Sequence, residues 1–348
     1  MTDVITFKPF SQIIGQERAI GFLKRVMTGE KIPHAYMFTG IPGVGKATTA
    51  MAMTQAVNCD EPLNGEGCGR CRSCRQVMNG NFADLIFVEP DGQNIKIEQI
   101  RDINRTLCFK PVSGRYRVCI IRKAELMTEE AANSFLKTLE EPPPGNILVL
   151  KVVESLDLLP TIVSRCQKIP FQPLPVRLIA EWLRNEKDMD EENASVAANL
   201  SEGSLGRAIH ICDSDFFEER QDFISRLIQL PGLSSEQALE MAMEYSGKAK
   251  KKVSDASDKS YTGLFDLLGI WKTWYRDLIL MKVKGPADLL LNRDFSRKLK
   301  NISKNFKTEN LIDSFFIVDQ AQRDLIRNPN IGLMMENTVL ALKRLSSA

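Results

Sequence analysis

The order of apolar and polar positions divides the chain near Pro173. Before that residue, short apolar runs alternate with longer segments of helical spacing, which predicts an α/β fold with a parallel sheet. The buried strands predicted in this way are Tyr36–Thr39, Leu85–Val88, Val118–Ile121, Ile147–Val152 and Gln167–Phe171. Residues 1–173 are therefore expected to form one α/β domain.

One helix between the third and fourth strands is predicted in detail. Thr128 can cap its start, and Glu129 and Glu130 lie in the first turn, where the helix dipole favours negative charge. Apolar residues follow at helical spacing, namely Ala132, Phe135, Leu136 and Leu139. The proline run 142–144 is expected to end this helix.

Beyond Pro173 the strand pattern ceases and the predicted elements are helices. Residues 174–211 are expected to form a small helical unit, and 212–348 a second helical domain whose large apolar residues form a bundle core. Its main helices are predicted around Leu264–Val283, Leu311–Leu325 and Ile331–Leu345. The Lys- and Ser-rich segment Ser246–Ser260 is predicted to be an exposed loop.

Composition narrows the class of protein. The 348 residues are 43% hydrophobic and 26% charged, as in an ordinary globular protein of several domains. No apolar run reaches about 18 residues and no secretory signal precedes the first domain, so we expect a cytoplasmic protein that contacts no membrane. A net charge of +2 argues against a protein that grips DNA by itself through a basic stripe.

A candidate phosphate-binding loop follows the first predicted strand. The sequence from Gly40 to Lys46 is GIPGVGK, and a helical pattern begins directly after it. Gly40, Gly43 and Gly45 let backbone N–H groups turn toward phosphate, and Lys46 can reach the terminal phosphates. A glycine-rich turn without a ligand is the alternative interpretation.

The residues that hydrolysis requires are missing around this loop. Ala47 stands where a Ser or Thr hydroxyl should hold magnesium, and Thr48 is rotated from that position by about 100° on a helix. Arg122 and Lys123 follow the third strand, where two carboxylates should bind the metal and polarise water. Glu125 lies beyond the strand end. We therefore expect no ATP hydrolysis by this chain alone, and binding of ATP or ADP stays open.

Four cysteines form a candidate metal site. Cys59, Cys68, Cys71 and Cys74 have the spacing C-x8-C-x2-C-x2-C, which favours structural Zn²⁺ in a closed tetrahedral site. An iron–sulfur cluster and unliganded thiols are the alternatives. The remaining cysteines are isolated and are expected to be buried apolar residues: Cys108, Cys119, Cys166 and Cys212.

Several motifs together resemble the bacterial clamp-loader family of AAA+ proteins, over most of the chain. They are Phe10–Gln16, the lead His34–Gly40 into the phosphate loop, the four-cysteine insertion, Met127–Pro142, and Pro160–Cys166 with its Ser-Arg-Cys signature. The resemblance implies three domains: a nucleotide-binding-type domain over 1–173 with a zinc module at 59–74, a helical lid over 174–211, and a helical collar over 212–348. The segment Leu325–Asn330 is similar to the one before the family's last helix.

The same resemblance assigns a role to Arg165. In this family the signature arginine reaches across a subunit interface to the neighbour's ATP, whereas a structural ion pair near the strand end is the alternative. The resemblance implies that Val152 or Val153 replaces the family's polar sensor. Gly206 stands where motor subunits carry arginine, with Arg207 displaced by one position. The chain keeps the arginine of the signature but lacks the residues that bind magnesium. This combination favours the delta-prime type over the gamma/tau type.

The partners implied by the resemblance are the other clamp-loader subunits, gamma/tau and delta. The sliding clamp and primer-template DNA would be reached through the complex, which belongs to the DNA polymerase III holoenzyme. Two rival functions remain: a working gamma/tau-like ATPase with a different metal ligand, and a stand-alone nucleic-acid-binding protein with a zinc finger. The near-neutral charge weighs against the second rival.

Overall fold

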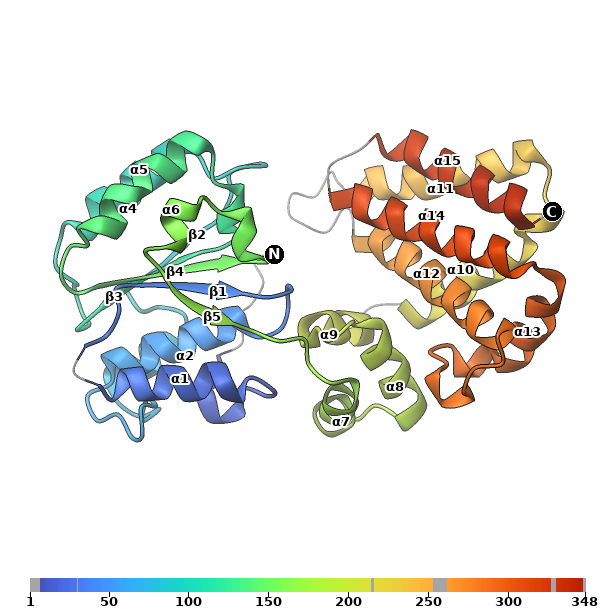
Figure 1. Cartoon of the computed structure of the whole chain (residues 1–348). Helices are drawn as coiled ribbons and strands as arrows, with labels where there is room; N and C mark the ends of the chain where they lie inside the picture. The colour runs from blue at the N-terminus through green and yellow to red at the C-terminus, as the bar shows by residue number, and fades with distance from the viewer. Residues whose placement is uncertain (1–6, 30, 214–215, 253–261, 327–329, 347–348) are drawn as a thin grey trace. The chain divides into compact units, whose positions relative to one another are not determined.

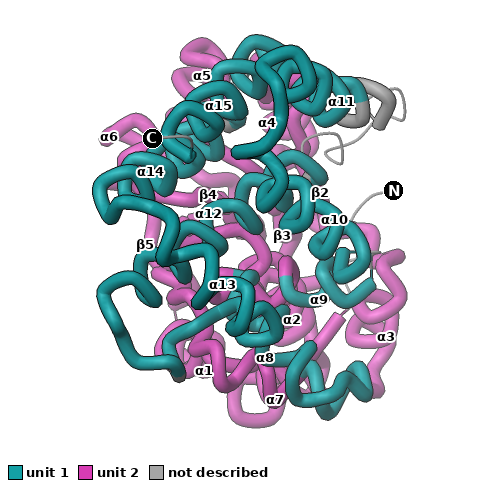
Figure 2. Tube along the Cα trace, turned by 90° about the vertical axis from the view of Figure 1, so that its right-hand side faces the viewer, with its two compact units in different colours: residues 1–2, 183–201, 208–348 teal, residues 3–182, 202–207 magenta. Residues whose placement is uncertain are grey.

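The computed structural model describes residues 7–29, 31–213, 216–252, 262–326 and 330–346. The chain forms two compact units (Figure 2). The sheet unit comprises residues 3–182 and 202–207, and the helical unit comprises residues 183–201 and 208–348 with the first two residues. The boundaries between units fall inside 174–211, so the separate lid, like the three-domain division, stays a prediction.

The sheet unit is built on five parallel strands. They are β1 (Ala35–Thr39), β2 (Leu85–Val88), β3 (Arg117–Ile121), β4 (Asn146–Val152) and β5 (Gln167–Pro170), in the order β2-β3-β4-β1-β5. The fold class and all five predicted strands are confirmed. All residues of β1 and β3 are buried, because helices cover both faces of the sheet. A strand buried on both faces has a continuous apolar run instead of alternating apolar and polar residues.

Helices cover the two faces of this sheet in separate layers (Figure 1). Helices α1 and α2 lie on one face, and α4 and α5 lie on the other. Leu23 and Met53 are buried on the first side, and Ile100 and Phe135 on the second. The helices of the sheet unit are α1 (Glu17–Met27), α2 (Lys46–Asn58), α3 (Arg72–Met78), α4 (Ile97–Leu107), α5 (Glu129–Glu140) and α6 (Pro160–Val163).

The helix predicted after Thr128 is α5. The Thr128 hydroxyl oxygen accepts a hydrogen bond from the Ala131 N–H over 3.2 Å, and two glutamates occupy the first turn. Phe135 and Leu139 are buried against the sheet. The helix ends at Glu140, ahead of the proline run, as its sequence predicts.

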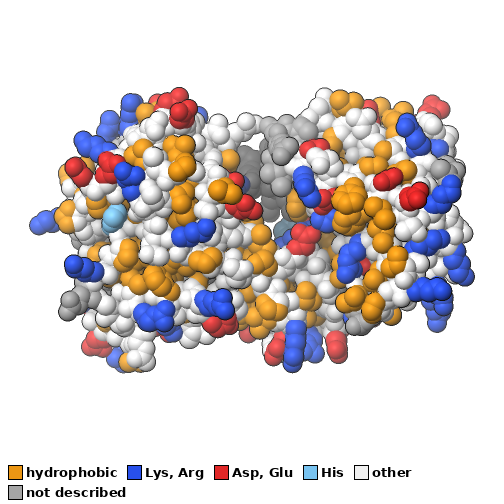
Figure 3. All heavy atoms as spheres, viewed as in Figure 1, with side chains coloured by type: hydrophobic (Ala, Val, Ile, Leu, Met, Phe, Trp, Pro, Cys, Tyr) orange, Lys and Arg blue, Asp and Glu red, His pale blue; other side chains and the backbone are white. Residues whose placement is uncertain are grey.

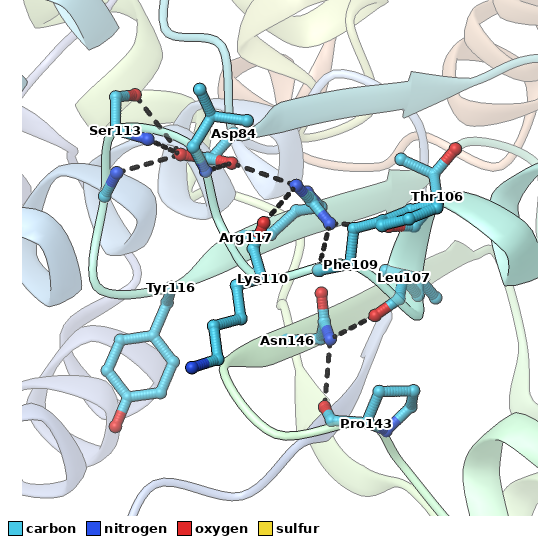
Figure 4. Close-up of polar contacts among 12 residues, drawn as sticks. Asp84, Thr106, Leu107, Phe109, Lys110, Ser113, Tyr116, Arg117, Pro143 and Asn146 are labelled. Carbon is cyan, nitrogen blue, oxygen red and sulfur yellow. Dashed lines mark hydrogen bonds and ion pairs between the residues drawn. The ribbon is translucent and has the colours of Figure 1, made fainter.

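A buried ion pair joins β2 and β3 at their amino ends (Figure 4). The Asp84 carboxylate accepts hydrogen bonds from three consecutive N–H groups beginning at Val112, over 2.7–2.8 Å. Arg117 donates to Asp84 over 3.3 Å and to the carbonyls of Thr106 and Phe109. Burial raises the pKa of Asp84, but the N–H bonds outweigh burial and hold that pKa below its usual value. The pair fixes the loop between α4 and β3.

The helical unit is a bundle. Trp271 and Trp274 of α12 are buried, which confirms that these aromatic residues form core. The helices are α8 (Glu191–Leu200), α10 (Phe216–Gln229), α11 (Ser235–Lys252), α12 (Thr262–Lys282), α13 (Ser296–Ile302), α14 (Thr308–Ile326) and α15 (Ile331–Ser346). Two further helices, α7 (Val176–Lys187) and α9 (Leu205–Asp213), each have residues in both units. Among the described residues, no helix is long and apolar enough to span a bilayer.

The prediction of an exposed loop over Ser246–Ser260 is wrong for its first half, residues 246–252. Helix α11 continues to Lys252, and Ser246 is buried with its hydroxyl donating to the Met243 carbonyl over 2.9 Å. Lysine is a good helix former, so a lysine-rich composition does not by itself end a helix. Residues 253–260 lie outside the described residues, as do 327–329 of the predicted Leu325–Asn330 segment.

Candidate functional site

The phosphate loop joins β1 to α2 in a conformation that needs its glycines. Gly40 and Gly43 have φ values of 137° and 78°, which residues with a side chain rarely adopt. A Cβ atom on Gly40 would lie 2.4 Å from the Phe171 carbonyl oxygen, so a side chain cannot fit there. The loop therefore has the backbone shape that its sequence predicts.

Lys46 folds back onto its own loop. Its side chain is buried, and its ammonium group donates to the carbonyls of Gly40 and, over 3.0 Å, of Ile41. Burial lowers the pKa of Lys46 to about 8, and the Glu125 carboxylate partly opposes this. The charge that should meet a terminal phosphate is thus satisfied by loop carbonyls.

The positions for magnesium and its water are occupied by unsuitable groups. Ala47 is the second residue of α2 and offers only a methyl group. Arg122, directly after β3, pairs with Glu89 over 2.5 Å and lies 5.0 Å above the Phe87 ring. Lys123 is exposed with a φ of 51°. A cation cannot replace a carboxylate ligand, so the residues present do not fit a magnesium ion at this end of β3.

Glu125 is a polar group of this site that its place in the sequence does not reveal. It belongs to the short helix Ala124–Leu126, and its Oε2 is buried with no hydrogen-bond partner in the part of the chain that the structure describes. Burial raises its pKa, as does the negative charge of Asp157, while Lys46 opposes the shift. The turn after β3 thus brings its carboxylate within electrostatic reach of the phosphate loop.

Gly206 lies directly on the phosphate loop. Its N–H donates to the Gly43 carbonyl over 2.9 Å, and a Cβ on Gly206 would lie 3.0 Å from the Gly43 Cα. Arg207 points to Glu202, at 3.7 Å. On the other side of the loop, Val152 is buried at the end of β4 and the Val153 carbonyl accepts from the Gly40 N–H. Backbone and apolar groups therefore stand at both candidate sensor positions.

Arg165 follows α6 and is about one-third exposed. Its Nη2 donates to Glu140 Oε1 over 2.6 Å, and its Nη1 donates to the Thr161 carbonyl over 2.9 Å. The structural ion pair, which is the alternative interpretation of Arg165, is therefore present in the structure of the single chain. A trans-acting role stays a prediction.

The four cysteines predicted as ligands come together. Their sulfur atoms all lie within 4.8 Å of one another, and the Cys68 and Cys74 sulfurs are 3.9 Å apart. Four thiolates at about 2.3 Å from a tetrahedral zinc ion would lie about 3.8 Å from each other. Cys59 follows α2, Cys71 caps α3 and Cys74 lies within it, so the two helices hold the ligands in place. The cluster fits a metal ion.

The thiols of the cluster differ in pKa, because only some of them receive N–H donors strong enough to offset burial. The backbone N–H groups of Arg70 and Cys71 lower the pKa of Cys68 to about 6. Burial raises the pKa of Cys59 and Cys74. A divalent cation would displace their protons and satisfy the buried sulfur atoms.

The isolated cysteines differ from one another. Cys119 is buried, as expected, and Cys166 and Cys212 are half-buried. The expectation is wrong for Cys108, which is exposed and donates to the Asn104 carbonyl over 3.2 Å. It is the C-cap of α4, directly after the last helical residue.

A parallel sheet in the order β2-β3-β4-β1-β5, with a phosphate loop after β1, defines an AAA+ protein. The family model described as "DNA polymerase III, delta subunit" matches residues 15–175. The chain is 30% identical to DNA polymerase III subunit delta' of Bacillus subtilis, over 97% of this chain and 99% of that protein. It belongs to the family of delta'-like clamp-loader subunits of DNA polymerase III.

Two other relatives show the range of this family. The chain is 31% identical to subunit delta' of Escherichia coli over 56% of its own length and 59% of that protein's. It is 28% identical to subunit tau of Bacillus subtilis over 92% of its own length, but spans only 59% of that protein. Similarity alone thus does not separate the delta' type from the tau type.

Proposed function

We propose that this chain is the delta-prime type of subunit in a DNA polymerase III clamp loader. It would not hydrolyse ATP itself and would supply Arg165 to the ATP site of a neighbouring gamma/tau subunit. The ring would load the sliding clamp onto primer-template DNA during replication in the cytoplasm. The observation that carries the proposal is the combination of an available Arg165 with Arg122 and Lys123 in place of catalytic carboxylates.

Loss of hydrolysis is supported by the residues at three positions. Phosphoryl transfer needs a metal to neutralise developing charge and a base to orient water. Ala47 supplies no ligand, and Arg122 already has Glu89 as its partner. Lys46 is held by its own loop carbonyls. Restoring activity would require changes at several of these positions together.

The ion pair of Arg165 does not prevent a trans-acting role. An exposed pair of this kind contributes about 0.2–1 kcal/mol. An arginine finger accelerates transfer by about 10³–10⁵, which corresponds to about 4–7 kcal/mol of transition-state stabilisation. The transition state at a neighbour's γ-phosphate would therefore hold the guanidinium more strongly than Glu140 does.

The test is ATP turnover by the reconstituted ring in the presence of clamp and primed DNA. Arg165→Ala should lower turnover at the neighbouring site by about 10³-fold or more, with assembly of the ring unchanged. Arg105→Ala is the matched control, since Arg105 forms an exposed pair with Asp102 elsewhere in the same unit. Equal turnover in both variants would contradict the finger role.

We further propose that the four-cysteine cluster holds structural Zn²⁺. An all-sulfur donor set suits zinc, and a closed site leaves no position for substrate. Metal analysis of the purified chain should return about one zinc per chain. Iron, or no metal at all, would contradict the assignment.

A gamma/tau-like ATPase is the second candidate, and Glu125 is the observation that favours it. Its unsatisfied, partly buried carboxylate lies within electrostatic reach of Lys46. The two candidates separate in an assay of the isolated chain. Magnesium-dependent ATP hydrolysis that is abolished by Lys46→Ala would establish this second function.

The net charge of +2 and the face drawn in Figure 3 support contacts to protein partners rather than independent binding of DNA. On the face that Figure 3 shows, basic and acidic side chains are interspersed instead of forming one basic stripe. Co-purification with the gamma/tau and delta subunits is the expected result. Tight DNA binding by the isolated chain at physiological salt would instead support a stand-alone nucleic-acid-binding protein.

A further inference from the structure

The four-cysteine module carries a tight turn in addition to its ligands. Leu63 and Glu66 exchange two backbone hydrogen bonds of 2.9 Å, and Asn64 and Gly65 between them have φ values of 52° and 74°. Gly65 lies against α1: a Cβ atom there would be 2.5 Å from the Lys24 carbonyl oxygen. The turn is therefore seated on α1, with Glu66 at its base.

The Glu66 carboxylate joins this turn to the N-terminal segment. One of its oxygens accepts from the Ser11 N–H over 2.8 Å and from the Ser11 hydroxyl over 2.9 Å, and the other accepts from Lys24 over 3.0 Å. Its side chain is 19% exposed. Hydrogen bonds to a charged acceptor, shielded in this way, are stronger than neutral ones. Ser11 lies in the short helix Phe10–Gln12, where Phe10 is buried.

The same segment reaches the phosphate loop at its other end. Gln16 is buried, and its side-chain amide donates to the Val44 carbonyl over 3.3 Å and to the Gln172 carbonyl over 2.8 Å. Its side-chain oxygen accepts from the Gln172 N–H over 3.1 Å. Residues 10–16 are thus fixed by the module on one side and by the phosphate loop on the other.

The module also touches the helix that begins at the phosphate loop. Gln55 of α2 donates from its side chain to the Cys74 carbonyl over 3.4 Å. A Cβ on Gly67 would lie 2.6 Å from the Gln55 side chain, so the module packs closely on α2. The four-cysteine module is therefore connected to the phosphate loop in two ways, through residues 10–16 and through α2.

We infer that Glu66 is a positioning residue that couples metal binding in the four-cysteine module to the placement of residues 10–16 against the phosphate loop. This inference rests on the proposed metal site. Glu66 lies two residues before Cys68, so a bound metal restrains the backbone from which its carboxylate reaches Ser11. Loss of the metal frees residues 59–74, and the carboxylate then leaves Ser11 and Lys24.

Hydrogen exchange of the full chain tests this coupling, with the Ser11 amide as reporter. Removing the metal with a chelator should speed exchange at Ser11 by about 10- to 100-fold, the range expected for losing hydrogen bonds to a charged group. Glu66→Gln should speed it similarly while the metal is bound, and chelation should then add little. Glu61→Gln is the matched control, because Glu61 lies in the same module but pairs with Arg70 at the exposed surface.

Metal content measured on the same samples separates the possible failures. A chain that binds no metal overturns the proposed metal site and the coupling with it. Bound metal with Ser11 exchange unchanged by chelation overturns the coupling alone. If Glu66→Gln loses its metal, Glu66→Asp takes its place, because its carboxylate is one methylene shorter and no longer reaches the Ser11 N–H. Unchanged Ser11 exchange in that metal-bound variant likewise overturns the role of Glu66.

Discussion

Arg165 and Glu140 form an ion pair in which Nη2 lies 2.6 Å from Oε1, joining the end of α5 to the residues that follow α6. In the proposed trans-acting role, Arg165 must leave this pair to reach a neighbour's nucleotide. Glu140→Gln should therefore raise ATP turnover of the reconstituted ring by up to about fivefold, since an exposed pair contributes at most about 1 kcal/mol. The steady-state rate of ATP hydrolysis by the ring measures this increase.

Asp102→Asn is the control for that substitution, because Asp102 belongs to an exposed pair with Arg105 on α4. It should leave turnover unchanged. A loss of more than tenfold in Glu140→Gln would mean that Glu140 holds Arg165 in its working position instead of competing for it.

Breaking the buried pair at the amino ends of β2 and β3 should destabilise the sheet unit strongly. Arg117→Met leaves Asp84 buried without its cation and removes donors from three carbonyls. We expect a loss of about 3–5 kcal/mol in the free energy of unfolding, measured by urea denaturation. Arg105→Met, at an exposed pair, should change it by less than about 0.5 kcal/mol.

The Asp84 carboxylate also makes the free energy of unfolding depend on pH in the acid range. The folded-state pKa of Asp84 lies below its unfolded value of about 3.9, so the folded state binds fewer protons in the acid range. Its stabilisation is complete above the unfolded pKa and is lost as pH falls through the folded pKa. Asp84→Asn should flatten that part of the stability curve in urea titrations between about pH 2 and 5. An equally steep curve would assign the acid sensitivity to other groups.

Substituting a cysteine of the cluster should lower thermal stability, whereas substituting an isolated exposed cysteine should not. With free zinc at 100 times its dissociation constant, binding contributes about 2.7 kcal/mol. For a unit of this size, Cys74→Ser should then lower the melting temperature by about 5–10 °C. Cys108→Ser changes an exposed thiol and should have no such effect. Calorimetry with and without a chelator checks both, and a chelator should no longer affect Cys74→Ser.

The sequence predicts the sheet because the apolar runs at Tyr36–Thr39 and Val118–Ile121 are buried on both faces. It predicts the cysteine cluster because short spacings bring the ligands together locally. Contacts between distant positions leave no such pattern: Glu66 and Ser11 are 55 positions apart. The return of Lys46 to its own carbonyls depends on burial that only the folded loop creates. A single cysteine such as Cys108 has no periodicity from which exposure could be predicted.

In a chain that does not hydrolyse ATP, as we propose for this one, the close approach of Gly206 to Gly43 would limit how the activity could be gained. An arginine introduced at position 206 would push its Cβ against backbone before its guanidinium could meet a phosphate. The backbone at Gly43 or at the start of α9 would have to shift by a few tenths of an ångström, and nothing is gained from that shift while Ala47 and Arg122 remain. Each reverting substitution is therefore useless or harmful unless the others are already present. Such an arrangement would make the proposed inactive state hard to reverse by single mutations, in evolution as in engineering.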